Sequence, residues 1–217
     1  MRWNAAGEAT SLSPTLNAIA HAVNGNGTVV AGHTLSHDPN SPGERAIRWT
    51  TDGEQLLVTL GGTNSHAFGV SDDGTITVGD SDVAGDAETH AVLWTTAGLQ
   101  DLGTLGGSFA TAYAISGDGL SVVGTSDVAG AANPSAFLWK SNLGMVDLNT
   151  YLPTLGINLA GWTLTEARGI SFDGSVITGS GLFDGQRQAF VVTGIPAPGT
   201  ALVLFLGGGI LVRRRGR

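Results

Sequence analysis

The chain has 217 residues, of which 34 are glycine, none is cysteine and 13% are charged. This length can supply the core of one domain, and the lack of cysteine excludes disulfides, thiolate zinc sites and cysteine nucleophiles. All 18 acidic residues precede position 195, so residues 1–194 carry a net charge of −12 and residues 195–217 carry +4. An acidic body repels phosphate backbones, and we expect no nucleic-acid partner.

An internal repeat begins with four similar segments. Each has an apolar residue, a small polar residue, an Asn-Gly or Asp-Gly pair, and a second glycine five residues beyond the first. The segments are AVNGNGTVVAG (22–32), GVSDDGTITVG (69–79), AISGDGLSVVG (114–124) and GISFDGSVITG (169–179). Asn-Gly and Asp-Gly between apolar runs are strong hairpin signals, and they predict a type I′ turn in each copy.

A second motif keeps the same period. Trp3, Trp49, Trp94 and Trp139 recur at intervals of 46, 45 and 45 residues, and AFVVT (189–193) stands in their place in the last cycle. We expect this segment to be a third strand, and 55–60, 100–105 and 145–151 to be fourth strands. Four short strands in about 45 residues is the length of a propeller blade. The regular spacing favours tryptophans packed in the core over tryptophans stacked on sugars.

The repeat predicts an all-β, β-propeller-like domain of four-stranded antiparallel sheets over residues 1–194. The chain starts at a Trp strand and the repeats stop after the equivalent strand, so the N-terminal piece could complete the last blade and close a ring of about four blades. The alternative is a fragment of a larger propeller. The third cycle is lengthened by an insertion around residues 149–162, and no window of the body has a convincing helical period.

The last segment, residues 195–217, has a different composition. Two prolines precede an apolar run at 201–212, and four of the last five residues are arginine. We expect a short hydrophobic helix that inserts into a membrane, with the arginines held on the cytoplasmic side.

This tail resembles the PEP-CTERM sorting signal. Pro196-Ala197-Pro198 corresponds to its Pro-x-Pro element, with alanine where glutamate is usual, and Arg213, Arg214 and Arg215 correspond to its basic end. The resemblance implies export, transient membrane anchoring, an exosortase-type processing enzyme and an association with exopolysaccharide.

The body resembles the HAF-type extracellular repeats. The likeness is carried by HAFGVSDDG (66–74), HAVLWT (90–95), QDLGTLGG (100–107) and SAFLWK (135–140). The resemblance implies a cell-surface or secreted protein and says little about activity.

No set of residues in the sequence points to catalysis. The histidines are interpreted as ordinary loop residues, because HTLSH (33–37) lacks the glutamate of a zinc-peptidase helix. DSDVAGD (80–86) lacks the glycine and glutamate of a calcium loop and is interpreted as an acidic turn. No carboxylate pair, phosphate loop or nucleophile elbow stands out. We therefore expect no catalytic, cofactor or metal site.

The leading hypothesis is an exported, non-enzymatic β-repeat protein of the cell surface or extracellular matrix, sorted or anchored through its tail. One alternative is a carbohydrate- or exopolysaccharide-binding propeller, whose site we would seek in the insertion (141–165), with Tyr151 and Trp162. A further alternative is an extracellular hydrolase or lyase.

Overall fold

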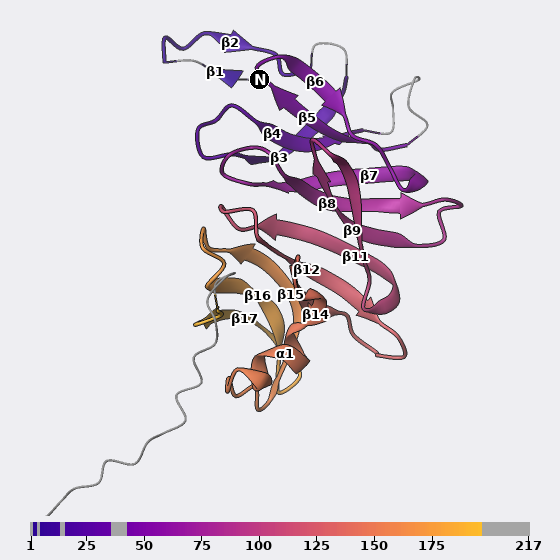
Figure 1. The fold of residues 1–217 in the computed structure, drawn as a ribbon, viewed down its shortest axis with the longest axis vertical. Helices are drawn as coiled ribbons and strands as arrows, with labels where there is room; N and C mark the ends of the chain where they lie inside the picture. The colour runs from indigo at the N-terminus through magenta and orange to yellow at the C-terminus, as the bar shows by residue number, and fades with distance from the viewer. Residues whose placement is uncertain (1, 4, 14–15, 36–42, 197–217) are drawn as a thin grey trace, which may run out of the picture.

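The computed structural model describes residues 2–3, 5–13, 16–35 and 43–196, and within them the protein is all-β with one short helix (Figure 1). Each cycle of the repeat forms an antiparallel sheet. An N-terminal hairpin precedes the sheets and consists of β1 (Arg2–Trp3) and β2 (Ala9–Thr10). Sheet 1 consists of β3 (Ala18–Val23), β4 (Val30–Thr34), β5 (Ala46–Thr50) and β6 (Gly53–Leu56).

The next two sheets repeat this order. Sheet 2 consists of β7 (Gly61–Val70), β8 (Thr77–Val83), β9 (Thr89–Thr95) and β10 (Gly98–Gly103). Sheet 3 consists of β11 (Gly106–Ile115), β12 (Ser121–Val128), β13 (Ser135–Lys140) and β14 (Gly144–Asp147). A single parallel pairing of Phe109 with Thr89 joins sheets 2 and 3. Sheet 4 consists of β15 (Trp162–Ile170), β16 (Val176–Phe183) and β17 (Gln186–Thr193).

The sheets follow one another from sheet 1 at the top of Figure 1 to sheet 4 at the bottom, and their first strands β3, β7, β11 and β15 contact one another in that order. The core is divided among the three junctions between adjacent sheets, each with its own apolar cluster. A small sheet is marginal alone and is stabilised by burying its faces against its neighbours. The array is therefore held together junction by junction.

Three of the four repeated tryptophans are core residues, as the sequence predicted, but Trp3 is 65% exposed, and for that residue the prediction was wrong. Trp49, Trp94 and Trp139 are 2%, 3% and 8% exposed. The indole Nε1 of Trp94 donates a 2.8 Å hydrogen bond to the carbonyl of Val58, in the segment that leads into the same sheet. The Trp94 indole supplies apolar surface to the junction of sheets 1 and 2, and the Trp139 indole to the junction of sheets 2 and 3. The Trp49 indole Nε1 donates a 2.6 Å hydrogen bond to the Ser13 hydroxyl.

The hairpin turns occur at the predicted places but are not of type I′. That turn needs positive φ at both central residues, whereas only the glycine of each pair has it, as at Gly74 with φ of 75°. The loop is longer than a two-residue turn, and the small polar residue that precedes it closes it with hydrogen bonds. In sheet 2 the Ser71 hydroxyl accepts a 3.0 Å bond from the Ile76 amide and donates a 2.6 Å bond to Asp73. Ser116 and Ser171 make the same pair of bonds.

These turns also connect the sheets to one another. The amide of Asp72 donates to the carbonyl of Gly117 in the next turn, and the amide of Asp118 donates to the carbonyl of Phe172, both at 3.1 Å. The Asn24 side chain donates to the carbonyl of Asp72 at 3.2 Å. A line of hydrogen bonds therefore fixes one end of each sheet to the next.

The second glycine of each repeat touches a bulge in the first strand of its own sheet. The pairing register shifts at Ala67/Gly69 in β7 and at the equivalent place in β3, β11 and β15. A Cβ added to Gly79 or Gly124 would collide with the backbone carbonyl oxygen of His66 or Thr111. These glycines are required by close approach between two backbones.

Two further expectations need correction. The N-terminal strand does not complete the last sheet, because β1 pairs with β2 at the opposite end of the row from β17 (Figure 1). Sheet 4 has three strands among the described residues. The insertion contains a helix, α1 (Leu148–Thr154), which replaces the second half of the predicted strand 145–151. It is capped by the Asp147 side chain, and its seven residues are too few to show a helical period.

The predicted membrane helix falls almost wholly outside the described residues, which end at Pro196. Among the described residues, no helix has the length and apolar character needed to span a bilayer.

The contact between glycine and bulge predicts the effect of two Gly→Ala substitutions. Gly124→Ala places a methyl group against a carbonyl oxygen and the Phe137 ring, and should lower the free energy of unfolding by roughly 1–3 kcal/mol. Gly169→Ala meets only the Thr178 hydroxyl, at a repeat position where Ala22 and Ala114 occur naturally. It should cost less than about 1 kcal/mol. Thermal or denaturant unfolding gives the loss of stability for each variant. Equal losses would contradict the conclusion that the contact with the bulge requires glycine.

Candidate functional site

The side chains that differ most between repeats lie on the first strands and beside the second glycine. One row along the first strands consists of His21, Phe68, Tyr113 and Arg168. Two residues earlier in the same strands are Ile19, His66, Thr111 and Glu166. Directly after the second glycine are His33, Asp80, Thr125 and Ser180. The repeated residues build the sheets, and these variable residues give each sheet its own chemistry.

The first of these rows forms a continuous ladder across the sheets, which we call the ring ladder: His21, Phe68, Tyr113 and Arg168. The rings of His21 and Phe68 are 5.0 Å apart, and those of Phe68 and Tyr113 are 5.7 Å apart. The guanidinium of Arg168 lies 3.8 Å from the centre of the Tyr113 ring. Aromatic contacts and a cation–π contact therefore connect all four first strands.

A second group, the histidine–carboxylate cluster, consists of His33, Glu44, His66 and Asp80. His66 is held on both ring nitrogens: Nδ1 lies 2.6 Å from Asp80 Oδ1, and Nε2 lies 2.8 Å from Glu44 Oε2. Asp80 is nearly buried and accepts a 2.8 Å bond from the Thr111 hydroxyl through its other oxygen. His33 Nε2 is 3.9 Å from Glu44 Oε2.

Strands and backbone hydrogen bonds hold the residues of this cluster in place. His33 lies on β4, His66 on β7 and Asp80 on β8, so two sheets contribute. Glu44 is fixed between them, because its carbonyl accepts a 2.8 Å bond from the Ser65 amide and its amide donates a 3.1 Å bond to the Asn64 side chain. The fixed backbone aims the Glu44 carboxylate at both histidines.

The electrostatics divide the histidines into two kinds. Burial lowers the pKa of His66, but the hydrogen bonds and charges of Asp80 and Glu44 outweigh it and raise that pKa to about 9. Burial, with repulsion from His66, lowers the pKa of His21 and His33. At neutral pH the cluster therefore holds one imidazolium between two carboxylates and two neutral imidazoles beside it.

A cavity of about 430 Å³ opens at the cluster, and Glu44, His66 and Asp80 form part of its wall. His33, Glu44 and His66 each present one ligand atom, and these three atoms lie within 4.8 Å of one another. Two imidazoles and a carboxylate are donors that suit zinc and other divalent transition metals. These residues could therefore hold a metal ion, although the sequence predicted no metal site.

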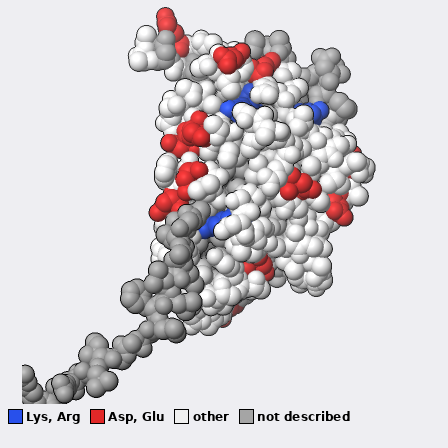
Figure 2. Space-filling model, viewed as in Figure 1, with Lys and Arg blue, Asp and Glu red and all other residues white. Residues whose placement is uncertain are grey.

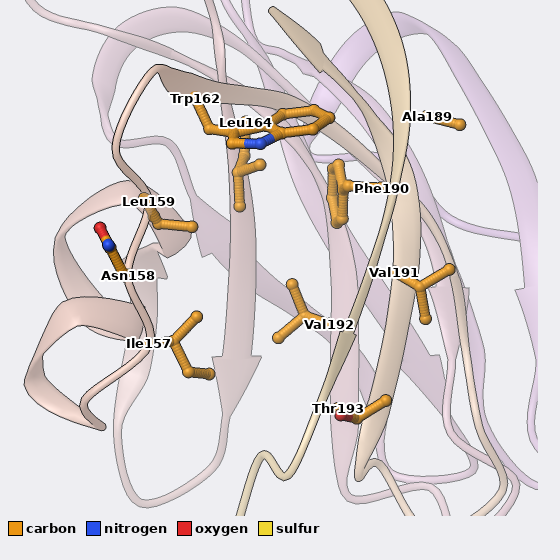
Figure 3. Close-up of a pocket in the computed structure, with 10 residues that line it drawn as sticks. All are labelled: Ile157, Asn158, Leu159, Trp162, Leu164, Ala189, Phe190, Val191, Val192 and Thr193. Atoms are coloured by element: carbon orange, nitrogen blue, oxygen red, sulfur yellow. The ribbon is translucent and has the colours of Figure 1, made fainter. Parts of the chain in front are cut away.

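A second cavity, of about 450 Å³, lies at sheet 4 beside the insertion (Figure 3). Ile157, Leu159 and Trp162 line one side, and residues 189–193 of β17 line the other. β17 is the third strand of its sheet, so the cavity follows the edge where β6, β10 and β14 pair in the other sheets. The ring of Trp162 also lies 5.2 Å from the ring of Phe183. The insertion thus contributes to a cavity, and Trp162 but not Tyr151 is among its lining residues.

The acidic turn 80–86 does not form a calcium-like loop. Asp80 binds His66 and Thr111, Asp82 binds Asn64 and Thr89, and Asp86 binds Thr63. The three carboxylates therefore serve different partners.

The other two histidines and the predicted sorting residues are not part of the histidine–carboxylate cluster. His90 is bound between Asp101 and Glu88, away from the cluster, and His37 is outside the described residues. The Pro196 carbonyl accepts a 2.6 Å bond from Lys140 Nζ. Ala197, Pro198, Arg213, Arg214 and Arg215 are also outside the described residues, so the sorting motif stays a prediction.

The sequence analysis missed the histidine–carboxylate cluster because it interpreted all the histidines as ordinary loop residues. In the structure His66 lies on a first strand and His90 on a Trp strand. Aligning the four first strands shows that His66 stands where the other copies have isoleucine, threonine and glutamate. This difference between copies was the feature of the sequence that could have indicated a special role for His66.

The surface agrees with the charge balance of the sequence. The face drawn in Figure 2 has scattered acidic side chains and few basic ones, with no continuous basic patch among the described residues.

No family model and no curated protein matches this sequence. Among solved structures, the chain is similar to TolB from Acinetobacter baumannii at 15% identity and a TM-score of 0.55, over 82% of this chain and 41% of that one. It is also similar to a protein assigned as TolB from Agrobacterium tumefaciens at 10% identity and a TM-score of 0.53, over 81% of this chain and 65% of that one. At these identities the likeness shows the fold alone, which is of the β-propeller type. The chain spans less than two thirds of both proteins.

The pKa of His66 predicts a pH dependence of stability. Because the folded pKa lies above the unfolded value of 6.5, the bound proton stabilises the fold fully below pH 6.5, and this contribution is lost as the pH rises through about 9. Asp80→Asn should reduce the loss, because it removes one of the two charges on the ring. NMR titration of the His66 ring with a chelator present gives the pKa directly. A midpoint near 6.5 would contradict the predicted charge state.

Proposed function

We propose that this chain is an exported, non-enzymatic β-repeat protein of the cell surface or extracellular matrix. In this role the propeller-type array is a scaffold that presents a row of variable side chains, and the C-terminal segment sorts or anchors it. The observation that carries the proposal is the separation between repeated and variable residues. Trp49, Trp94, Trp139 and the paired glycines are used in packing and turns, while the variable residues gather on the first strands.

The cavities support a binding role over a catalytic one. No carboxylate is among the residues that line the cavity at Trp162. Three carboxylates line the other cavity. Glu44 and Asp80 are both bonded to His66 at 2.8 Å or less, and Asp82 is bonded to Asn64 and Thr89. A glycosidase needs two carboxyl groups that face the same bond, with one of them free to donate a proton.

The sorting role rests on the tail sequence. An apolar run followed by Arg213, Arg214 and Arg215 is suited to a short stay in a membrane with the basic end on the cytoplasmic side. An exosortase-type enzyme would then act near Pro196-Ala197-Pro198. The bond from Lys140 to the Pro196 carbonyl would hold the end of the folded body at the start of that motif.

Removing the tail tests the sorting role. A chain that ends at Pro196 keeps the Lys140 contact and every described strand, and should appear in the medium or soluble fraction instead of the envelope. The matched control is Ala197→Glu in the full chain, which restores the usual residue of the motif and should leave the fractionation unchanged. If the truncated chain remains in the envelope to the same extent, the tail is not the anchor.

A carbohydrate-binding role is the second candidate, and the Trp162 cavity favours it. The Trp162 ring is half-buried at a cavity with apolar walls and polar groups from Asn158 and Thr193. An aromatic face beside a few polar groups is the usual arrangement for holding a sugar ring. An exopolysaccharide chain would present many such rings.

Trp162→Ala should weaken binding to purified exopolysaccharide by roughly tenfold or more, equivalent to about 1.4 kcal/mol, as measured by isothermal titration calorimetry. Trp3→Ala is the control, because Trp3 is 65% exposed and lines neither of the two larger cavities. Equal binding by all three proteins, or an equal loss in both variants, would rule out a sugar site at Trp162.

A further inference from the structure

We propose that His33, Glu44 and His66 form a binding site for a divalent transition metal of the zinc class. This inference does not depend on the proposed surface role or on the tail. It rests on the identity of the donor atoms, their spacing, the residues behind them and the cavity in front of them.

The donor atoms are close to the arrangement that zinc requires. Zinc–nitrogen and zinc–oxygen bonds of about 2.0–2.2 Å in a tetrahedron place ligand atoms roughly 3.3–3.6 Å apart. Glu44 Oε2 is 2.8 Å from His66 Nε2 and 3.9 Å from His33 Nε2, values on either side of that range. All three donor atoms lie within 4.8 Å of one another, so side-chain adjustments of about an ångström would bring them to one ion.

Both histidines are oriented from behind, which is the usual arrangement at protein metal sites. The nitrogen of His66 that faces away from Glu44 is bonded to Asp80, and Asp80 is in turn bonded to Thr111. The corresponding nitrogen of His33 lies 2.9 Å from His21 Nε2. A hydrogen bond from His33 Nδ1 to His21 leaves the lone pair of His33 Nε2 facing Glu44. At His66 a bound metal ion would displace the Nε2 proton, and the hydrogen bond from Nδ1 to Asp80 would hold the ring in the orientation to bind.

Burial and charge also fit a cation. His33 is 8% exposed and Asp80 is 5% exposed, so the His33 ring and the carboxylate that supports His66 are both shielded from water. Asp80 and Glu44 bring two negative charges to one small volume, and a bound cation would balance them. Two imidazoles favour zinc-class ions over calcium or magnesium, which prefer all-oxygen sites.

The site would keep a position open to solvent. Glu44 and His66 line the 430 Å³ cavity, so a fourth ligand can approach from that side. Three protein ligands with one open position distinguish such a site from a closed structural zinc site. A small oxygen- or nitrogen-bearing ligand could therefore bind the metal through the cavity.

Zinc binding tests the proposal on the full chain, without a histidine tag and after treatment with a chelator. Titration with Zn²⁺ against a chromophoric chelator should give one tight site per chain. Glu44→Gln and His66→Ala should weaken it at least tenfold. Asp80→Asn should weaken it by roughly 10–100-fold although Asp80 is not a ligand. Cobalt(II) should give the strong visible absorption of a four-coordinate site, which Glu44→Gln should reduce.

His90→Ala is the matched control. His90 also lies between two carboxylates, at 3.1 Å from Glu88 and 2.9 Å from Asp101, but among the described residues it belongs to no group of three potential metal ligands. This variant should bind zinc as the unaltered chain does. Glu44→Gln and Asp80→Asn keep the shape of the side chains, and circular dichroism would verify their fold. The proposal is overturned if the unaltered chain binds no zinc, if Glu44→Gln and Asp80→Asn bind as tightly as it does, or if His90→Ala loses as much.

Discussion

The close contact between the second glycine of each repeat and the bulge of the first strand determines most of the structure. At Gly32, Gly79, Gly124 and Gly179 the first two strands approach so closely that a Cβ would meet a carbonyl oxygen. The bulge adds one residue to the first strand, and that residue is His21, Phe68, Tyr113 or Arg168. The ring ladder is therefore a direct product of the bulge, and the bulge is possible only opposite glycine.

The same contact accounts for the position of the histidine–carboxylate cluster. The carbonyl that touches Gly79 belongs to His66, and the residue after Gly79 is Asp80. The glycine contact thus sets His66 and Asp80 opposite each other across two strands, where their side chains meet at 2.6 Å. The contact between glycine and bulge occurs in all four sheets. It produces a specific site only where the side chains on the two strands are complementary, as His66 and Asp80 are.

The sequence predicted those features that recur at a fixed period. The strands at the second and third positions of each cycle, the burial of Trp49, Trp94 and Trp139, and the propeller-type fold were all predicted. Type I′ turns were wrong because the Ser71, Ser116 and Ser171 hydroxyls close longer loops. Each of these hydroxyls accepts a hydrogen bond from the amide five residues later, and an Asn-Gly or Asp-Gly pair alone does not indicate that bond. Helix α1 was missed because seven residues are too short to show a period.

The histidine–carboxylate cluster could not be derived from spacing, since its members come from two sheets and from the segment before β5. His66 is 22 residues from Glu44 and 33 from His33 in the sequence, and only the packing of sheet 1 on sheet 2 brings them together. Aligning the copies marks His66 and Asp80 as departures from the repeat, but it does not mark them as partners. The three-dimensional contact between sheets supplies that information.

The separation of repeated and variable positions has a consequence for how such a chain can change over time. Turn, glycine and tryptophan positions specify the backbone, so the residues at 19, 66, 111 and 166 and their neighbours can be exchanged without redesigning a sheet. Each added cycle supplies one more interchangeable position at a known distance from the last. The array is in this sense a modular surface, in which new recognition arises by substitution at a few sites and a wider footprint arises by duplication.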